Sequence, residues 1–386
     1  MKKTIALLLC VAMMLSILPM AVFAEGNTGE IVLPPDCFHS FIYTNNGDNH
    51  TKTCKYCGGS VTEAHTFVND VCVCGAVETV EDPTLDEALV FATINLQLES
   101  FIGADFFFTK TCVANYDSYY VRFTYPTTGG PVTEDMEVTA YSKYYYAEHL
   151  VQATEMSDVI EATIYAVKDG VTYHGPTTEW VLKNSMREKF DNAKSTEADK
   201  ALCVAILNYG EKAQYRFSYN TSDLATSVLT AAEIENYLLA PRAAVSVDAT
   251  TSTGKTGVTF YKMALSAGSV TVLNVMFAKS SSTNINDVEC HISYIDRTGV
   301  AQTAVIDEFT PSGSRYVVLF DKVAANQLDE VLTITFYSKT TGQPISETRT
   351  YSEESYIADN PSSNQLQTNL YTALVQYADA AIAKFG

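Results

Sequence analysis

The sequence contains little positive charge and none of the common motifs that mark enzymes. Its 386 residues carry 25 lysines and arginines against 45 aspartates and glutamates, for a formal net charge of −20. A chain this acidic repels phosphate backbones and has no basic stripe, so we expect no nucleic-acid partner. Because no GxSxG, GxGxxG, P-loop, HExxH or EF-hand pattern occurs, the prediction is a non-enzymatic protein without catalytic residues.

Long apolar runs are absent beyond the N-terminus. A basic start, an apolar segment over residues 5–18 and the small residues Val22 and Ala24 form the three parts of a signal peptide. That segment is too short to cross a hydrocarbon core of about 30 Å comfortably. We therefore expect residues 1–24 to be removed on export, leaving no transmembrane segment in the mature chain. The predicted location is secreted, extracellular or at the cell surface.

Cysteine and histidine are concentrated in one short segment, residues 37–74. Five of the nine cysteines and three of the six histidines lie within it. Zinc takes four nitrogen or sulfur ligands in a tetrahedron, and closely spaced pairs supply two of them from one turn. The candidate metal ligands are Cys37, His39, His50, Cys54, Cys57, His65, Cys72 and Cys74.

This segment has too few large apolar residues to form a core of its own. A structural zinc would supply the missing folding free energy, on the order of 10 kcal/mol or more. Gly58 and Gly75 directly follow Cys57 and Cys74, where a glycine lets the turn adopt a positive φ and direct amides at the sulfur. The cofactor prediction is structural zinc, one or two ions.

Several arrangements of the ligands remain open. Eight ligands could fill two zinc sites, and one site of four thiolates (Cys54, Cys57, Cys72, Cys74) with the histidines outside it fits equally well. Disulfides are compatible with export, but five cysteines cannot all pair within the segment, and disulfides give no reason for the histidines. The third alternative is that the histidines lie on the surface and bind no metal. Catalytic zinc is disfavoured because it keeps three ligands and an open water position.

The order of these residues resembles a known module. The pattern His-x10-His-x3-Cys-x2-Cys-Gly, followed by His-Thr-Phe and Cys-x-Cys-Gly, is similar to a module of exported surface proteins from Gram-positive, Clostridia-type bacteria. The resemblance covers residues 37–76. It implies a zinc-ribbon-like element that precedes tandem β-rich repeat domains of unassigned activity.

Beyond a polar, proline-marked linker at residues 80–84, the chain repeats itself. Residues 156–170 match 328–342, and both read as a strand that enters a hairpin turn. Residues 202–217 match 370–385 through five identities: Leu202/Leu370, Ala205/Ala373, Tyr209/Tyr377, Ala213/Ala381 and Phe217/Phe385. The last four recur every four residues and so form one ridge of an α-helix. We expect each ridge to dock on its own β-domain.

The remaining pattern indicates antiparallel sheets. Runs of β-branched and aromatic residues recur at spacings of about 8–15 residues, and a short amphipathic helix is expected at residues 229–241. The predicted fold class is mainly β with appended α: a small zinc-ribbon-like module followed by two tandem β-sandwich (Ig-like) units, each ending in an α-helical segment. The expected divisions are 1–24 (signal peptide), 25–80 (Cys/His zinc-binding module), 84–240 (unit 1) and 241–386 (unit 2).

The cysteines of the repeats, and the histidine beside one of them, are expected to have structural rather than catalytic roles. Cys112, Cys203 and Cys290 are expected to be small buried hydrophobic residues. Cys290 and His291 are neighbours in a strand, so their side chains should point to opposite faces and form no dyad.

Tyrosine is the abundant aromatic residue, with 24 copies against a single tryptophan. Exposed tyrosines suit contacts with sugars or proteins, although tyrosine also favours β-sheets without any ligand. The predicted function is a binding, adhesion or spacer protein whose partner is an extracellular protein or a glycan. The first alternative is a carbohydrate-binding accessory protein that uses tyrosine-rich sheet faces, and the second is an unrecognised extracellular hydrolase. The sequence does not determine the oligomeric state.

Overall fold

The computed structural model describes residues 41–47, 49–55, 58–68, 71–76, 83–98, 102–127, 129–267, 271–296 and 299–386. They fall into two compact units that divide between Asp82 and Pro83, and each unit is described by itself. The predicted signal peptide, residues 1–24, and the candidate ligands Cys37, His39 and Cys57 lie outside the described residues. No helix in the described ranges is both long and apolar enough to span a membrane.

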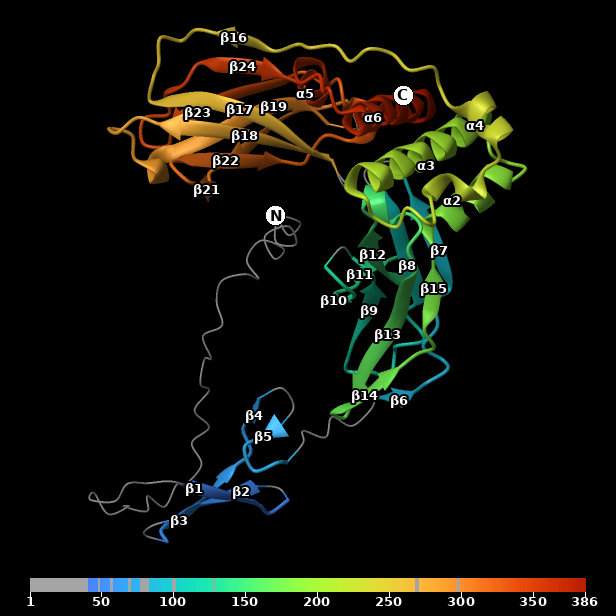
Figure 1. Cartoon of the computed structure of the whole chain (residues 1–386), viewed down its shortest axis with the longest axis vertical. Coiled ribbons are helices and arrows are strands. Elements are labelled where there is room, and N and C mark those ends of the chain that lie inside the picture. Colours follow the sequence, from blue (N-terminus) through green and yellow to red (C-terminus); the bar gives the residue numbers. More distant parts are fainter. Residues whose placement is uncertain are drawn as a thin grey trace. The chain divides into compact units, whose positions relative to one another are not determined.

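The first unit contains a three-stranded antiparallel sheet and a separate short hairpin (Figure 1). The sheet has the order β1-β2-β3, formed by Phe41–Asn45, Asn49–Cys54 and Ser60–Ala64. The hairpin pairs β4 (Phe67–Val68) with β5 (Val71–Cys72). These short pairings place polar and thiol side chains, rather than large apolar ones, at the centre of the unit.

The second unit begins with two sheets that pack face to face. One has the order β10-β9-β13-β14-β6, with β15 also paired to β13. Its strands are Val132–Met136, Ser118–Tyr125, Ile160–Lys168, Val171–His174, Thr84–Leu85 and Thr178–Trp180. The other has the order β11-β12-β8-β7, formed by Thr139–Tyr141, Tyr144–Leu150, Gly103–Thr109 and Thr93–Gln97. The Phe106 and Phe123 rings, one from each sheet, meet with centroids 5.0 Å apart.

A second pair of sheets follows further along the chain (Figure 1). One has the order β16-β24-β23-β19-β20, formed by Ala249–Thr251, Thr348–Tyr351, Leu332–Ser338, Val288–Ile295 and Ala301–Ile306. The other has the order β17-β18-β22-β21, formed by Val258–Ala267, Thr271–Lys279, Arg315–Phe320 and Thr310–Ser312. Phe277 and Phe336 join the two sheets with ring centroids 4.4 Å apart. The predicted mainly β fold class is therefore confirmed.

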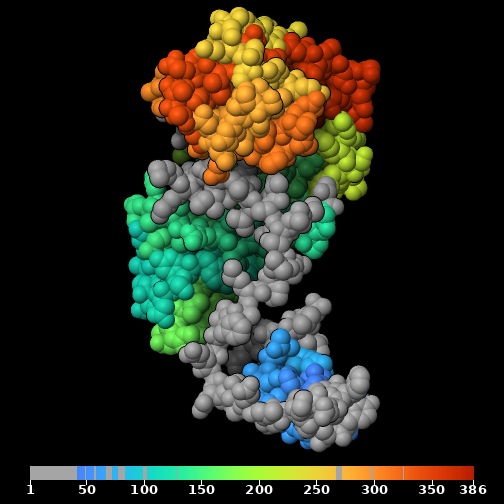
Figure 2. Space-filling model, turned by 90° about the vertical axis from the view of Figure 1, so that its left-hand side faces the viewer, coloured from blue at the N-terminus to red at the C-terminus, as the bar shows by residue number. Residues whose placement is uncertain are grey.

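The two sandwiches share the same strand pairing and the same inward aromatic pair. In the first, Phe108 of β8 pairs with Tyr145 of β12; in the second, Phe277 of β18 pairs with Tyr316 of β22. The rings of each pair also contact one another. The hairpin turns that the repeat predicts end on glycines with positive φ, 78° at Gly170 and 64° at Gly342. Figure 2 shows the first sandwich in teal to green and the second in yellow to red.

Helices follow each sandwich. After the first come α2 (Leu182–Asp191), α3 (Glu197–Phe217) and α4 (Ala231–Tyr237); after the second come α5 (Glu353–Asp359) and α6 (Gln365–Phe385). Short 3-10 turns lie at Ala153–Glu155 (η1), Ala225–Val228 (η2), Ile285–Asp287 (η3) and Ala325–Gln327 (η4). Helix α4 falls within the predicted helix 229–241 but is shorter. It begins at a capping box between Thr230 and Glu233.

The repeated ridges meet at their tyrosines, which corrects the expectation that each docks on its own sandwich, and Phe217 at the end of the first ridge is exposed. Tyr209 of α3 and Tyr377 of α6 are both buried and stack with centroids 5.9 Å apart. One continuous apolar core includes the first sandwich and both helices, whereas the second sandwich has a separate core. Helix α3 approaches its own sandwich with another side, where a Cβ on Gly210 would lie only 3.1 Å from the Ala153 carbonyl oxygen.

Contacts between α3 and α6 come in pairs related by the 168-residue offset of the repeat. Arg216 Nε donates to Gln367 Oε1 at 2.6 Å, and Lys384, the counterpart of Arg216, lies 2.9 Å from Asp199, the counterpart of Gln367. At the centre, Asn208 donates to its own counterpart, Gln376. The start of each helix meets the end of the other, so the helices are antiparallel around a local two-fold axis. Matched residues of the two helices therefore have equivalent environments because the helices meet across this axis. Sequence identity between the repeats predicts equivalent environments, but it does not distinguish this arrangement from docking at two separate sites.

Candidate metal centre

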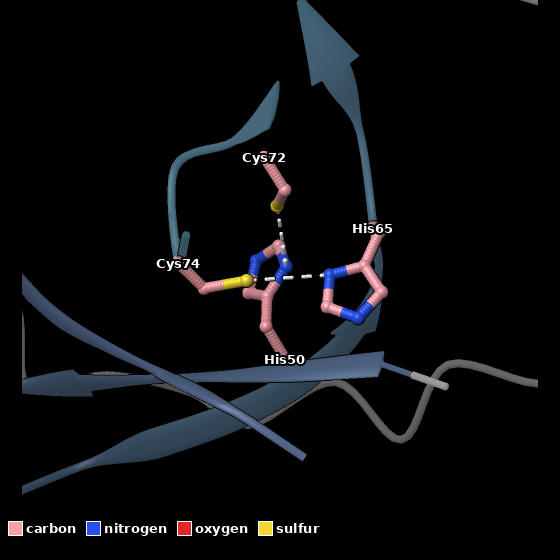
Figure 3. Close-up of side chains that lie close together, drawn as sticks. All are labelled: His50, His65, Cys72 and Cys74. Carbon is pink, nitrogen blue, oxygen red and sulfur yellow. Dashed lines mark hydrogen bonds between the residues drawn. The ribbon is translucent and has the colours of Figure 1, made fainter. Parts of the chain in front are cut away.

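Four side chains converge in the first unit from three short elements. His50 lies in β2, His65 follows the end of β3, and Cys72 and Cys74 lie in and just after β5. Their potential ligand atoms all lie within 4.8 Å of one another (Figure 3). His50 and Cys72 are buried, whereas His65 and Cys74 are half-buried. Two consecutive hairpins, β2–β3 and β4–β5, thus contribute two ligands each.

The spacing of these atoms suits a tetrahedral ion. Cys72 Sγ lies 3.4 Å from His50 Nδ1, and Cys74 Sγ lies 3.3 Å from His65 Nδ1. Zinc–sulfur and zinc–nitrogen bonds of about 2.3 and 2.0 Å at tetrahedral angles would separate sulfur from nitrogen by about 3.5 Å. The two thiols and two imidazoles could therefore hold one ion with small adjustments.

Both imidazoles are oriented by their other ring nitrogen. His50 Nε2 lies 3.2 Å from Glu63 Oε1, and His65 Nε2 lies 2.8 Å from the Gly47 carbonyl oxygen. When Nε2–H donates to these acceptors, Nδ1 keeps its lone pair and faces the sulfur atoms. An acceptor behind each imidazole is the usual companion of a metal-bound histidine, because it fixes both tautomer and ring orientation.

Glu63 is held in place by a second contact. Lys52 Nζ lies 2.6 Å from Glu63 Oε2. The hydrogen bond from Lys52 is the main cause that lowers the pKa of Glu63, and the bond with His50 adds to it. The carboxylate is therefore ionised and available to accept from His50.

The glycines after Cys57 and Cys74 adopt the predicted positive φ, whereas their amides donate to carbonyl oxygens. Gly58 and Gly75 have positive φ values of 69° and 83°. The Gly58 amide donates to the Cys54 carbonyl oxygen at 3.0 Å, and the Gly75 amide donates to the Cys72 carbonyl oxygen at 2.8 Å. The left-handed residue closes each turn tightly at low cost because glycine has no Cβ.

The environment of Cys72 favours the thiolate. Burial alone would raise the pKa of this thiol, but the hydrogen bonds that it receives outweigh burial and lower its pKa to about 6. The largest of them comes from the Cys74 amide, and the Thr66 amide adds another. A thiolate is the form that binds metal ions.

The structure brings together four of the eight predicted ligands. Cys54 is buried at the end of β2 but does not belong to the four-residue cluster. His50 and His65 lie inside the cluster, whereas Cys57, a member of the alternative site of four thiolates, lies outside the described residues. Cys72 and Cys74 carry free thiols.

Sequence reasoning missed Glu63 and the Gly47 carbonyl. Glu63 is the direct cross-strand partner of His50 in the β2–β3 hairpin. A predicted hairpin register would have placed the carboxylate beside the imidazole, because directly opposed residues share one face of a sheet. The Gly47 carbonyl had no signal in the sequence.

The cysteines of the second unit carry no sign of reactivity. Cys203 and Cys290 are fully buried, as expected, whereas Cys112 is only half-buried. Burial raises the pKa of Cys203 to about 12 and also raises that of Cys290. The half-exposed His291 lies 2.8 Å from Glu289 on the opposite face of the strand from Cys290, so the predicted absence of a dyad is confirmed.

No protein-family model and no curated protein sequence matches this chain. The candidate metal centre is therefore supported by its own geometry and chemistry alone.

Proposed function

We propose that His50, His65, Cys72 and Cys74 bind a structural zinc ion that folds the N-terminal module of an exported, non-enzymatic binding or spacer protein. The observation that carries the proposal is the orientation of both imidazoles, Nδ1 toward the thiols and Nε2 onto an acceptor. Two thiolates and two imidazoles are a common set for structural zinc. Four protein ligands leave no coordination position for a substrate or a reactive water, which supports a structural role over a catalytic one.

The rest of the chain supports a role in binding or spacing. Two sandwiches joined through a buried helix pair would hold their outer faces at a fixed separation. The signal-peptide pattern at residues 1–24 supports a location outside the cell, in the secreted fraction or at the cell surface.

Elemental analysis of the purified protein tests the proposal. We expect bound zinc, and we expect Cys72→Ser combined with Cys74→Ser to remove one ion per chain. Cys112→Ser, a half-buried thiol of the second unit, is the matched control and should retain all the zinc. If an ion remains after the double substitution, the other four candidates (Cys37, His39, Cys54 and Cys57) hold it. A metal-free protein whose Cys72 and Cys74 are oxidised would refute the zinc proposal in favour of disulfides.

A further inference from the structure

Four aromatic rings gather on the outer face of the sheet β11-β12-β8-β7. They are Phe107, Tyr141, Tyr144 and Tyr146, which together we call the outer aromatic patch. The Phe107 centroid lies 6.1, 6.0 and 5.1 Å from those of Tyr141, Tyr144 and Tyr146, respectively. Tyr145, the residue between two of them, points inward and contacts Tyr119. The alternation of a strand therefore places the patch on the side away from the core.

Phe107 shows that the patch is a separate surface feature. Its side chain is only 8% exposed, yet it belongs to neither of the two apolar cores. The three tyrosines surround it, and Tyr141 is itself 62% exposed. A group of aromatic rings outside the core is the kind of surface that marks a binding site.

The second sandwich indicates that the fold does not require this patch. The shared strand register aligns Phe107, Tyr141, Tyr144 and Tyr146 with Met276, Ser312, Arg315 and Val317. The inward pair Phe108–Tyr145, by contrast, keeps aromatic partners in Phe277–Tyr316. The core is thus repeated while the outer rings are not, so packing does not explain the four rings.

The border of the patch is polar. Its nearest cross-strand neighbours on the same face are Thr93, Thr109 and Thr139. Further along, Asn95 and Glu148 flank Asp105 across the sheet, and the buried Asp105 carboxylate accepts from Gln97. The threonines, Asn95 and Glu148 offer hydroxyl, amide and carboxylate groups rather than aliphatic surface. The rings span three neighbouring strands, about 10 Å in all, which is wider than one sugar ring.

We infer that the outer aromatic patch binds a neutral polysaccharide; this inference deepens the proposed binding function and rests on it. A sugar ring has apolar C–H faces and a rim of hydroxyls, so it matches aromatic rings bordered by hydrogen-bonding side chains. The net charge of −20 disfavours an acidic polymer. The scarcity of aliphatic side chains around the rings favours a sugar over an apolar protein surface.

A glycan array followed by affinity electrophoresis tests this inference on the whole protein. The gels would contain soluble neutral polymers (xyloglucan, galactomannan, glycogen or mixed-linkage glucan) or the acidic polymer polygalacturonate. We expect at least one neutral polymer to retard the protein. Tyr141→Ala and Tyr146→Ala should each weaken that binding at least tenfold without changing the thermal unfolding midpoint. The control is Tyr261→Ala, which removes an exposed tyrosine of the second sandwich and should leave binding unchanged.

Three results would overturn the inference: no neutral glycan bound, binding insensitive to Tyr141→Ala, or an equal loss in Tyr261→Ala. Sedimentation that shows a self-association abolished by Tyr141→Ala would instead assign the patch to a second copy of the chain. Zinc content measured on the same samples separates this test from that of the metal centre, because none of these tyrosines lies in the first unit.

Discussion

The two compact units of the chain reach stability by different means. In the described part of the first unit, the buried apolar residues are Cys54, Cys72 and Ala76, and His50 is buried beside them. The second unit contains two apolar cores built from phenylalanine, leucine, isoleucine and valine. Full burial of one such side chain contributes about 1.5–3 kcal/mol. The comparison indicates that the second unit can fold by burial alone, whereas the first requires another source of free energy.

Metal removal should produce the largest difference between the units. We expect a strong chelator to unfold the first unit, because structural zinc contributes on the order of 10 kcal/mol to modules of this size. Amide hydrogen exchange should then show protection lost throughout residues 41–76. Residues 83–386 should keep their protection, since no ligand of the described cluster comes from them.

Two controls sharpen that experiment. Added zinc should restore the lost protection, whereas magnesium should not, because magnesium prefers oxygen ligands. Loss of protection throughout both units would show that the sandwiches also depend on the ion and that the two units do not differ in their need for metal.

Truncation of the stacked tyrosines tests how far cooperativity extends within the second unit. Tyr209→Ala and Tyr377→Ala should each cost about 3–5 kcal/mol, as for other large buried aromatic residues. Because the two rings contact each other, the double variant should cost less than the sum, with a coupling of about 0.5–3 kcal/mol in denaturant unfolding. The exposed Tyr261→Ala is the control and should cost no more than about 1 kcal/mol, because it loses only a surface contact with Arg315.

Additive effects, with each substitution destabilising only its own sandwich, would contradict the shared helix core. That outcome would restore the expectation that each helix packs only on its own sandwich.

The smallest effect should appear in the pH dependence of folding stability, through Glu155 of η1, which lies where η1 meets α3. Burial, with a further contribution from the Asp158 charge, raises the pKa of Glu155 to about 7, above the value of about 4.3 in an unfolded chain. Ionisation of Glu155 therefore lowers the stability of the fold progressively as the pH rises from about 4 to 7. Glu155→Gln should stabilise the second unit by about 1 kcal/mol at pH 8 and have little effect near pH 4.

Thermal unfolding at several pH values measures this difference, with the exposed Glu161→Gln as control. The first unit should respond in the opposite direction, because protons displace a metal from thiolates and imidazoles as the pH falls. An effect of Glu155→Gln that did not change with pH would show that the carboxyl is not held neutral by its surroundings.

Local patterns predicted most of the sheets. Strand-like runs such as 117–125 and 288–295 coincide with β9 and β19, because alternation and β-branching act within a few residues. Helix α2 was missed, although Leu182, Met186 and Phe190 recur every four residues and are buried. The partner of the repeated ridges could not be derived, since a ridge shows that one face of a helix is buried but not what covers it.

The candidate site was predictable in composition but not in arrangement. Clustering of cysteines and histidines identified His50, His65, Cys72 and Cys74 among eight candidates. Which four meet depends on how two hairpins lie against each other, and residue spacing carries no such information. The sequence also did not show which tyrosines face outward. Only the strand register shows that Tyr145 points inward and that Tyr144 and Tyr146 point outward.

The antiparallel contact between α3 and α6 is one that two identical molecules would make as a homodimer. Here both partners belong to one chain, so the segment that connects them, residues 218–364, fixes their effective concentration whatever the dilution of the protein. The contact is also closed, because each helix uses its repeated ridge on the other. A third repeat could not join by the same surface, and the described pair is complete with two.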